Sequence, residues 1–183
     1  KVPILIVDDT VIFESAVINE YIDEAYPPTL QPEDLLLKAK NRSWVEFSNN
    51  ISLYTFQLSV KEEKIDFERV LKELLDDFDR VEEYLWAEPF FNGKQFSLVD
   101  ASYAPIFQRL NFLEQIYKPI IIKDRYPKLI NWKDNLLSLK AVKESTVAEI
   151  QNLYYQLLWT RQGYISSYLS EKEYGKRQPK KLY

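Results

Sequence analysis

The first thirteen residues of the chain contain two short apolar runs that predict a β-hairpin. Residues 4–7 form a β-branched run, and residues 11–13 form a second apolar run. Asp8-Asp9-Thr10 stands between them and has the composition of a turn. An isolated hairpin is only marginally stable in water. Because no later segment has a convincing strand pattern, we expect the hairpin to join a sheet that is completed by residues before Lys1.

From Glu14 onward the apolar positions follow the three- and four-residue spacing of a helix. The positions with this spacing are Ala16, Val17, Ile18, Tyr21 and Ile22. Tyr26-Pro27-Pro28 ends the helix, because proline does not continue it. Residues 27–32 are rich in proline and predict a linker between two domains.

The rest of the chain predicts an all-helical domain. Its expected helices cover about residues 32–58, 66–86, 98–115, a segment that starts near Pro127, and residues 147–169. The helix over 98–115 is apolar on nearly every face, which predicts a place in the middle of the bundle. Pro105 predicts a kink in this central helix.

Two of these helices have apolar stripes that indicate their buried sides. In the helix over 66–86 the stripe consists of Phe67, Val70, Leu71, Leu74, Leu75, Phe78, Val81 and Leu85. In the last helix it consists of Val147, Ile150, Leu153, Tyr154, Leu157 and Leu158.

These patterns divide the chain into a mixed α/β part and an all-α part. The hairpin and first helix occupy residues 1–27, and the helical domain occupies residues 28–170. Residues 171–183 are polar and basic, and we expect them to form a flexible tail.

Composition limits the classes of partner and the cellular location that we expect for the protein. The 183 residues are 46% apolar and carry a net charge of −4. Proteins that hold nucleic acid through its phosphates are usually basic, so we expect no nucleic-acid partner. No apolar run approaches the ~18 residues needed to cross a bilayer, and no signal peptide opens the chain. We therefore expect a cytoplasmic protein with no membrane partner.

Three residue types are absent from the sequence, and each absence limits the chemistry. Without Cys, the chain has no disulfide, no thiolate nucleophile and no cysteine metal site, and without His it lacks the commonest general base and metal ligand. We expect no metal. Without Met, the chain does not begin at a translation start, so we expect it to be a fragment, a processed product or part of something longer.

Residues near the start of the chain have the chemistry to bind a peptide that carries an amino-acid head group. A helix N-terminus favours a carboxylate, Ser15 can add a hydroxyl donor there, and Glu14 can face an ammonium. Val2, before Pro3, can offer its main-chain groups to a peptide that adds as a strand. A structural explanation also fits the spacing, with Ser15 as a helix N-cap and Glu14 as a first-turn acid. From spacing alone it is the favoured explanation, because helix caps are far commoner than ligand sites.

The string of residues 2–24 resembles the second half of the thioredoxin-like domain of cytosolic glutathione transferases. The resemblance implies a partial thioredoxin-like domain, a hairpin and a helix, followed by the family's all-helical C-terminal bundle. It also implies glutathione as co-substrate and a homodimer.

The resemblance also assigns the binding residues. It implies that Pro3 is cis and that Val2 pairs its main chain with the cysteinyl part of glutathione. It implies that Glu14 and Ser15 hold the γ-glutamyl group. Lys1 would contact the glycyl carboxylate.

A second patch, residues 96–105, resembles the family's Ser/Thr-x-x-Asp capping box at the start of the central helix. Ser97 can accept a hydrogen bond from the N–H of Asp100, and the Asp100 carboxylate can reach back to the N–H of Ser97. Ala101 departs from the pattern, because a larger apolar residue there would pack better against Phe96. Tyr126-Pro127-Lys128-Leu129, followed by Trp132, is also similar to the family's segment after this helix.

The resemblance implies a glutathione S-transferase that conjugates or transfers glutathione to an electrophilic small molecule. In the family, the Tyr, Ser or Cys that activates the thiol lies in a segment that would precede Lys1, so no residue of this chain is assigned a catalytic role. A Cys there would imply a thiol transferase or dehydroascorbate reductase. A non-enzymatic binding or assembly module on the same fold is a further alternative.

The electrophile would lie against the helical domain. By resemblance, the residues on the helices that line this pocket are Asn41, Trp44, Phe47, Tyr103 and Phe107. The competing interpretation is that these aromatic side chains belong to the core, because buried aromatics dominate protein cores.

Overall fold

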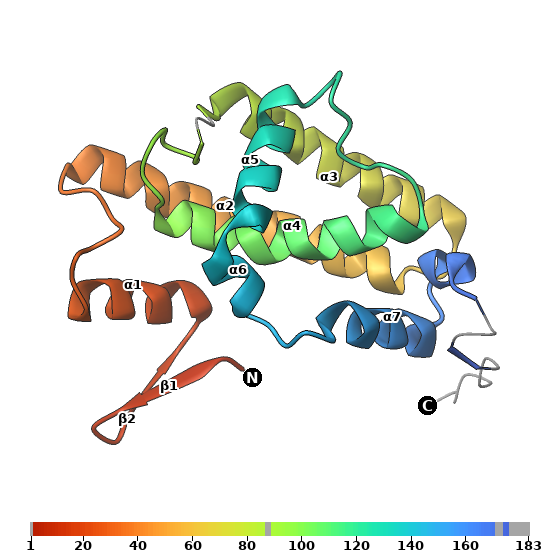
Figure 1. Ribbon diagram of the computed structural model, residues 1–183, viewed down its shortest axis with the longest axis horizontal. Helices are drawn as coiled ribbons and strands as arrows, with labels where there is room; N and C mark the ends of the chain where they lie inside the picture. Colours follow the sequence, from red (N-terminus) through yellow and green to blue (C-terminus); the bar gives the residue numbers. More distant parts are fainter. Residues whose placement is uncertain (1, 87–88, 171–173, 176–183) are drawn as a thin grey trace.

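The computed structural model describes residues 2–86, 89–170 and 174–175, and it contains a hairpin and helix beside a helical bundle (Figure 1). Strands β1 (Ile4–Val7) and β2 (Thr10–Phe13) pair antiparallel, as the sequence predicts. Asp8 and Asp9 both have positive φ, 45° and 65°. A two-residue turn of this kind matches the twist of the strands it joins, and Asp is among the residues that tolerate it.

The hairpin has one exposed face and one face toward helix α1 (Ser15–Ala25). Ile4 pairs with Phe13 and Ile6 with Val11, so these four side chains share a face, where they are 52–65% exposed. Leu5 and Ile12 pair on the other face and are half-buried. Helix α1 contacts both strands.

The linker after α1 is held by a buried carboxylate. Asp23 accepts hydrogen bonds from the N–H of Leu30 at 2.6 Å and of Gln31 at 3.1 Å. The chain then enters α2 (Leu35–Val60), whose N-cap Asp34 accepts from the N–H of Leu37 at 2.7 Å. Three main-chain donors of the connection are therefore satisfied by two aspartates.

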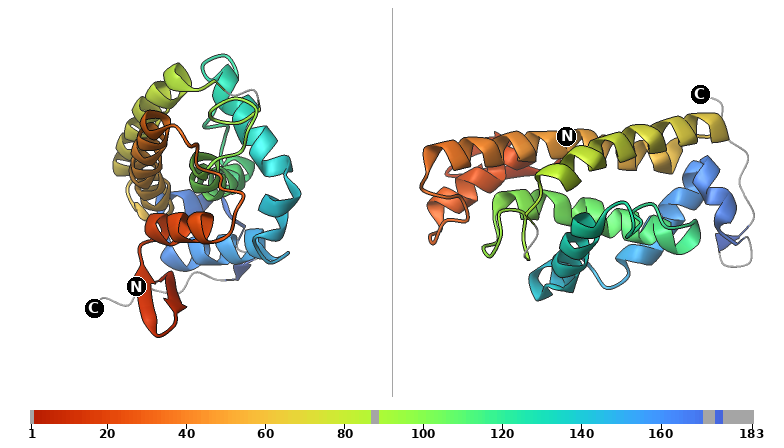
Figure 2. Two further views of the ribbon diagram at one scale, coloured as in Figure 1. Left: turned by 90° about the vertical axis from the view of Figure 1, so that its left-hand side faces the viewer. Right: turned by 90° about the horizontal axis from the view of Figure 1, so that it is seen from above.

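The helical domain is built around α4 (Leu98–Ile116). Two views show α4 between a layer formed by α2 and α3 (Lys64–Tyr84) and another formed by α5 (Pro127–Ser138) and the C-terminal helices (Figure 2). Ten residues of α4 are buried, which confirms its predicted central place. On α3, Phe67, Val70, Leu74, Phe78 and Val81 are buried as predicted, with Leu85 just beyond the helix.

The C-terminal region differs from its prediction, which was one helix over 147–169. The chain forms α6 (Lys140–Glu144), α7 (Ile150–Arg161) and a 3₁₀ helix, η1 (Tyr164–Tyr168). The break lies at Gly163, where an added Cβ would come within 2.9 Å of the Ser59 carbonyl oxygen. This close approach lets the Tyr164 N–H donate to the Lys61 carbonyl at 2.6 Å.

The stripe predicted for the last helix was also partly wrong. Val147, Leu153 and Leu157 are exposed, while Leu158 is fully buried. Tyr155 and Trp159, which were not in the predicted stripe, are buried instead. Most of the predicted basic tail, residues 171–183, lies outside the described residues.

Asp100 is a buried polar side chain that connects several elements of the bundle. Its carboxylate is fully buried and accepts four hydrogen bonds. Oδ2 accepts from the N–H and the hydroxyl of Ser97 at 2.8 and 2.7 Å, within the capping box at the start of α4. Oδ1 accepts from the N–H of Phe91 at 2.9 Å and from Trp132 Nε1 at 2.7 Å. One residue thus joins α4, α5 and the loop between α3 and α4.

Helix α5 receives a second tertiary contact at its first turn. Glu82 of α3 accepts from the N–H groups of Lys128 and Leu129, at 2.9 and 2.7 Å. A carboxylate at the N-terminus of α5 accepts from two donors that have no partner within the helix, and it interacts favourably with the positive end of the helix dipole.

Among the described residues, no helix is long and apolar enough to span a bilayer.

We predict that Asp100→Ala lowers the free energy of unfolding by at least about 3 kcal/mol, since it leaves three buried N–H donors unpaired. Urea unfolding followed by circular dichroism measures the change. Asp134→Ala, an exposed change on α5, is the control and should stay within about 0.5 kcal/mol of the wild type. A loss for Asp100→Ala no larger than that of the control would contradict the assigned role.

Candidate functional site

The hairpin register brings the two predicted binding segments together. Ile4 is opposite Phe13, so residues 2–3 and residues 14–15 extend from the same end of the hairpin. Opposed Cα atoms of antiparallel strands lie about 4.5–5.5 Å apart. The Val2–Pro3 peptide is cis, as the resemblance implies, and Val2 is 84% exposed. Lys1, the fifth predicted binding residue, lies outside the described residues.

Glu14 makes the turn from β2 into α1. It is the N-cap residue of the helix, with φ 65° and ψ 119°, and its carbonyl accepts from the N–H of Ile18 at 3.0 Å. Its side chain makes no capping hydrogen bond. A positive φ is uncommon for a residue with a Cβ, and such conformations cluster at functional sites.

Ser15 is the first helical residue and is exposed. The structural explanation of the sequence placed Ser15 at the N-cap. In the structure Glu14 has that position instead. The first N–H groups of α1 have no partner within the helix, and the positive end of its dipole lies at the same point. Glu14 and Ser15, which are both exposed, and the N-terminus of α1 thus follow β2 at the end of the hairpin from which Val2 extends.

Helix α1 carries these groups on a backbone that is fixed to the bundle by ion pairs. Arg42 of α2 donates to both carboxylate oxygens of Glu20, from Nε at 2.7 Å and from the guanidinium Nη2 at 2.8 Å. Lys38 pairs with Glu24 at 3.3 Å. The hydrogen bond from Arg42 is the main cause that lowers the pKa of Glu20, and burial opposes it.

Two of the residues predicted to line an electrophile pocket lie in the core instead. Tyr103 and Phe107 are fully buried and pack on Trp132, with ring centroids 4.8 and 5.0 Å away. Among the described residues the Tyr103 hydroxyl has no hydrogen-bond partner, and burial raises the pKa of this hydroxyl far above its ordinary value. Both aromatic side chains are part of the buried core, because α4 is covered on both sides.

The other three predicted pocket residues lie on α2. Asn41 is buried, donates to Gln31 Oε1 at 3.2 Å and accepts from Asn92 at 2.8 Å. It lines a cavity of about 600 Å³ that has both polar and apolar walls. Trp44 and Phe47 are half-buried and pack edge to face, with centroids 5.3 Å apart.

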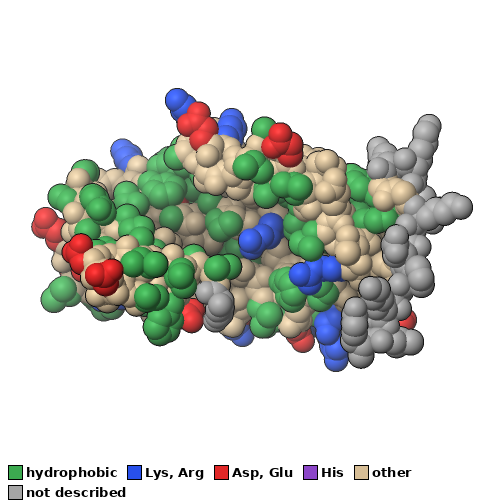
Figure 3. All heavy atoms as spheres, turned by 90° about the horizontal axis from the view of Figure 1, so that it is seen from below, with side chains coloured by type: hydrophobic (Ala, Val, Ile, Leu, Met, Phe, Trp, Pro, Cys, Tyr) green, Lys and Arg blue, Asp and Glu red, His purple; other side chains and the backbone are tan. Residues whose placement is uncertain are grey.

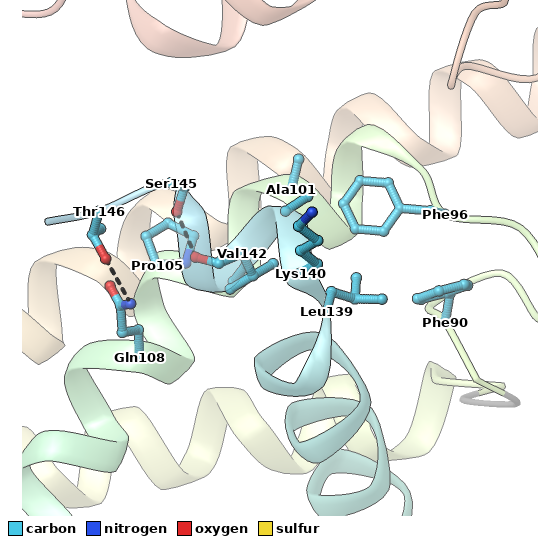
Figure 4. A pocket seen from close by; sticks show the side chains of 12 residues that line it. Phe90, Phe96, Ala101, Pro105, Gln108, Leu139, Lys140, Val142, Ser145 and Thr146 are labelled. Carbon is cyan, nitrogen blue, oxygen red and sulfur yellow. Dashed lines mark hydrogen bonds between the residues drawn. The ribbon is translucent and has the colours of Figure 1, made fainter. Parts of the chain in front are cut away.

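The structure contains a larger apolar cavity that the sequence analysis missed. It has a volume of about 670 Å³ and lies between α4, α6 and the loop before α4 (Figure 4). Its lining comprises Phe90, Phe96, Ala101, Ala104, Pro105, Gln108, Leu139, Lys140, Ala141, Val142, Ser145 and Thr146. The face seen from below is hollowed near its middle, and hydrophobic side chains gather around the hollow among polar and charged ones (Figure 3). Ala101, the small residue beside Phe96, was the one indication in the sequence.

Two protein-family models match the chain. The model described as "Glutathione S-transferase, N-terminal domain" matches residues 1–24, and the model described as "Glutathione S-transferase, C-terminal domain" matches residues 66–134.

Curated relatives extend the similarity over most of the chain. Glutathione S-transferase omega-1 of Sus scrofa is 31% identical over 79% of this chain, which spans 62% of that protein's length. Glutathione S-transferase 3 of Glycine max is 27% identical over 84% of this chain and 70% of its own.

Solved structures share the fold. Glutathione transferase Omega 3C from Trametes versicolor superposes with a TM-score of 0.72 at 21% identity, over 80% of this chain and 67% of its own. A Tau class glutathione S-transferase from mango, Mangifera indica, superposes with a TM-score of 0.72 at 22% identity, over 86% of this chain and 76% of its own. A glutathione S-transferase from Methylobacillus flagellatus, solved with glutathione bound, superposes with a TM-score of 0.66 at 21% identity, over 80% of this chain and 75% of its own.

We predict that Glu20→Gln lowers stability at pH 7 by about 0.5–1 kcal/mol, a small effect because the pair is partly exposed and screened by solvent. The folded-state pKa of Glu20 is lowered below its ordinary value of 4.5, so the contribution is complete above that pH. It is lost as the pH falls through the lowered folded pKa.

Urea unfolding at pH 7, 5, 4 and 3 measures this dependence. The difference between wild type and variant should be constant down to about pH 5 and shrink below it. Glu33→Gln, an exposed change in the linker, is the control. A difference that grows as the pH falls would show that the ion pair does not stabilise α1.

Proposed function

Because the chain belongs to the glutathione S-transferase family, we propose that it binds glutathione at the open end of the hairpin, as part of a protein that transfers glutathione to an electrophilic small molecule. The observation that carries this proposal is the register of β1 and β2. It brings Val2 and Pro3 beside Glu14 and Ser15, which are eleven or more residues apart in the sequence.

Each group at this end matches one part of glutathione. The γ-glutamyl head group carries an ammonium and a carboxylate. We assign the ammonium to Glu14 and the carboxylate to the Ser15 hydroxyl together with the first N–H groups of α1. The peptide would run along Val2, which lies before the first paired residue of β1 and is exposed, and would pair with its main chain as an added strand. Lys1 is assigned to the glycyl carboxylate.

The chain's part in the reaction is to bind and orient the tripeptide. Glutathione brings the nucleophilic sulfur. After the thiol loses its proton, the transfer forms a bond from that sulfur to an electrophilic carbon, and the bond from this carbon to a leaving group such as halide breaks, with its electron pair going to the leaving group. We assign no proton-removing or thiolate-stabilising role to a residue of this chain. The relatives' names support this function, as does the bound glutathione in the structure from Methylobacillus flagellatus.

We predict that the full-length protein is retained on immobilised glutathione and that the double variant Glu14→Gln, Ser15→Ala is not. Glutamine keeps the side-chain length at the positive-φ position, so the change removes the charge without altering the backbone requirement. Loss of one charged hydrogen bond of about 1.5–3 kcal/mol corresponds to roughly 10- to 150-fold in affinity.

Asn19→Ala, exposed on the same helix, is the matched control and should be retained like the wild type. Retention of the double variant would refute the site assignment. Failure of the wild type to bind would refute the glutathione proposal itself. Turnover of an aryl halide with glutathione distinguishes a transferase from a member of the fold that only binds.

A further inference from the structure

The proposed glutathione site lies at the end of α1 that is far from the linker to the bundle. The linker joins the C-terminal end of α1 to α2, whereas the hairpin joins its N-terminal end, where Glu14 and Ser15 lie (Figure 1). The step from Ser15 to Asp23 is about 12 Å along a helix axis. A tilt of about 5° at Asp23 would therefore move Ser15 by about 1 Å, and a misplacement of this size can cost about 100-fold in an enzyme reaction.

Gln31 is a linker residue that faces α1 at two points. Its N–H donates to Asp23 Oδ2 at 3.1 Å. Its side-chain amide faces the carboxylate of Glu20. The hydrogen bond from Arg42 is the main cause that lowers the pKa of Glu20, and the Gln31 amide is the smallest. Glu20 and Asp23 are three positions apart and so share one face of α1, which means that Gln31 restrains both the tilt and the rotation of the helix.

A row of amides connects Gln31 to the bundle. Asn41 of α2, which is 1% exposed, donates to Gln31 Oε1 at 3.2 Å. Asn41 Oδ1 in turn accepts from Asn92 Nδ2 at 2.8 Å, in the loop before α4. Each amide of the row accepts on one side and donates on the other, so the bonds polarise one another and fix the orientation of the Gln31 amide.

The last donor of this row is left without a full partner. Gln31 is 6% exposed, and its Nε2 has no partner within hydrogen-bond distance among the described residues. A buried unpaired donor is costly and needs an explanation. The Glu20 carboxylate offers one, because its charge attracts the amide hydrogens even where the geometry of a hydrogen bond is not met.

We propose that Gln31 is a positioning residue for the glutathione site, acting through Asp23 and Glu20 to hold α1 at the angle that presents Glu14 and Ser15 to the γ-glutamyl group. This inference rests on the proposed glutathione binding. The orientation of α1 can nevertheless be measured without the ligand, so the two proposals are tested separately.

Residual dipolar couplings of the free full-length protein test the orientation of α1 relative to α2. Gln31→Met keeps an apolar side chain of similar size and removes the amide. The angle between the two helices should change by about 5° or more, and the amide signals of Glu14 and Ser15 should shift. Gln156→Met, the same change at an exposed position of α7, is the control and should alter neither. An unchanged angle in Gln31→Met would overturn the proposal.

Calorimetric titration with glutathione tests the consequence for binding. Gln31→Met should weaken binding roughly tenfold, because the charged contacts at the N-terminus of α1 lose their alignment, and Gln156→Met should not. A wild type that binds, with Gln31→Met binding equally tightly, would refute the role of Gln31 alone. A wild type that does not bind would refute the glutathione proposal and this role with it.

The double variant Gln31→Met, Asn41→Leu separates positioning from stability. The single variant leaves the buried Asn41 donor unpaired, and the double variant removes that donor, so urea unfolding should show recovery of part of the lost stability. Half-buried Asn92 can turn to water instead. Glutathione affinity should stay low. If affinity recovers together with stability, Gln31 has only a structural role and the proposal is overturned.

Discussion

The buried carboxylate of Asp100 is the interaction on which the helical domain depends. A charge without water is costly unless it is fully hydrogen-bonded, and Asp100 meets this condition with four donors. Those donors come from the α4 cap, the preceding loop and Trp132 of α5. The carboxylate therefore fixes the start of the central helix and the position of α5 against it. Tyr103 and Phe107 complete the same cluster by packing on the Trp132 ring.

The proposed site depends on this bundle through α1. Asp23 holds the linker by two main-chain donors, and Arg42 holds Glu20 from α2. Because the hairpin packs one face on α1 and exposes the other, the contacts that hold α1 to the bundle also hold the hairpin. The N-terminus of α1 and the end of the hairpin consequently form one unit, in which the turn at Glu14 sets the direction of both.

Local pattern was sufficient for the hairpin, α1 and the Ser97–Asp100 cap, because each is decided by residues close together in the sequence. It was insufficient where distant segments meet. The break at Gly163 follows from the approach of the Ser59 carbonyl, which no periodicity reveals. Tyr103 lies in the core because α4 is covered on both sides. The cavity beside Ala101 exists because α6, which the sequence did not predict, lies over α4.

The central claim is that an amino-acid head group is held where the hairpin ends and α1 begins. The most direct measurement is a titration of ¹⁵N-labelled full-length protein with glutathione, followed by amide NMR shifts. The largest shifts should fall on Val2, Glu14, Ser15 and Ala16, with little change along α3 and α7. Shifts confined to the helical bundle, with those four amides unmoved at saturating glutathione, would contradict the claim.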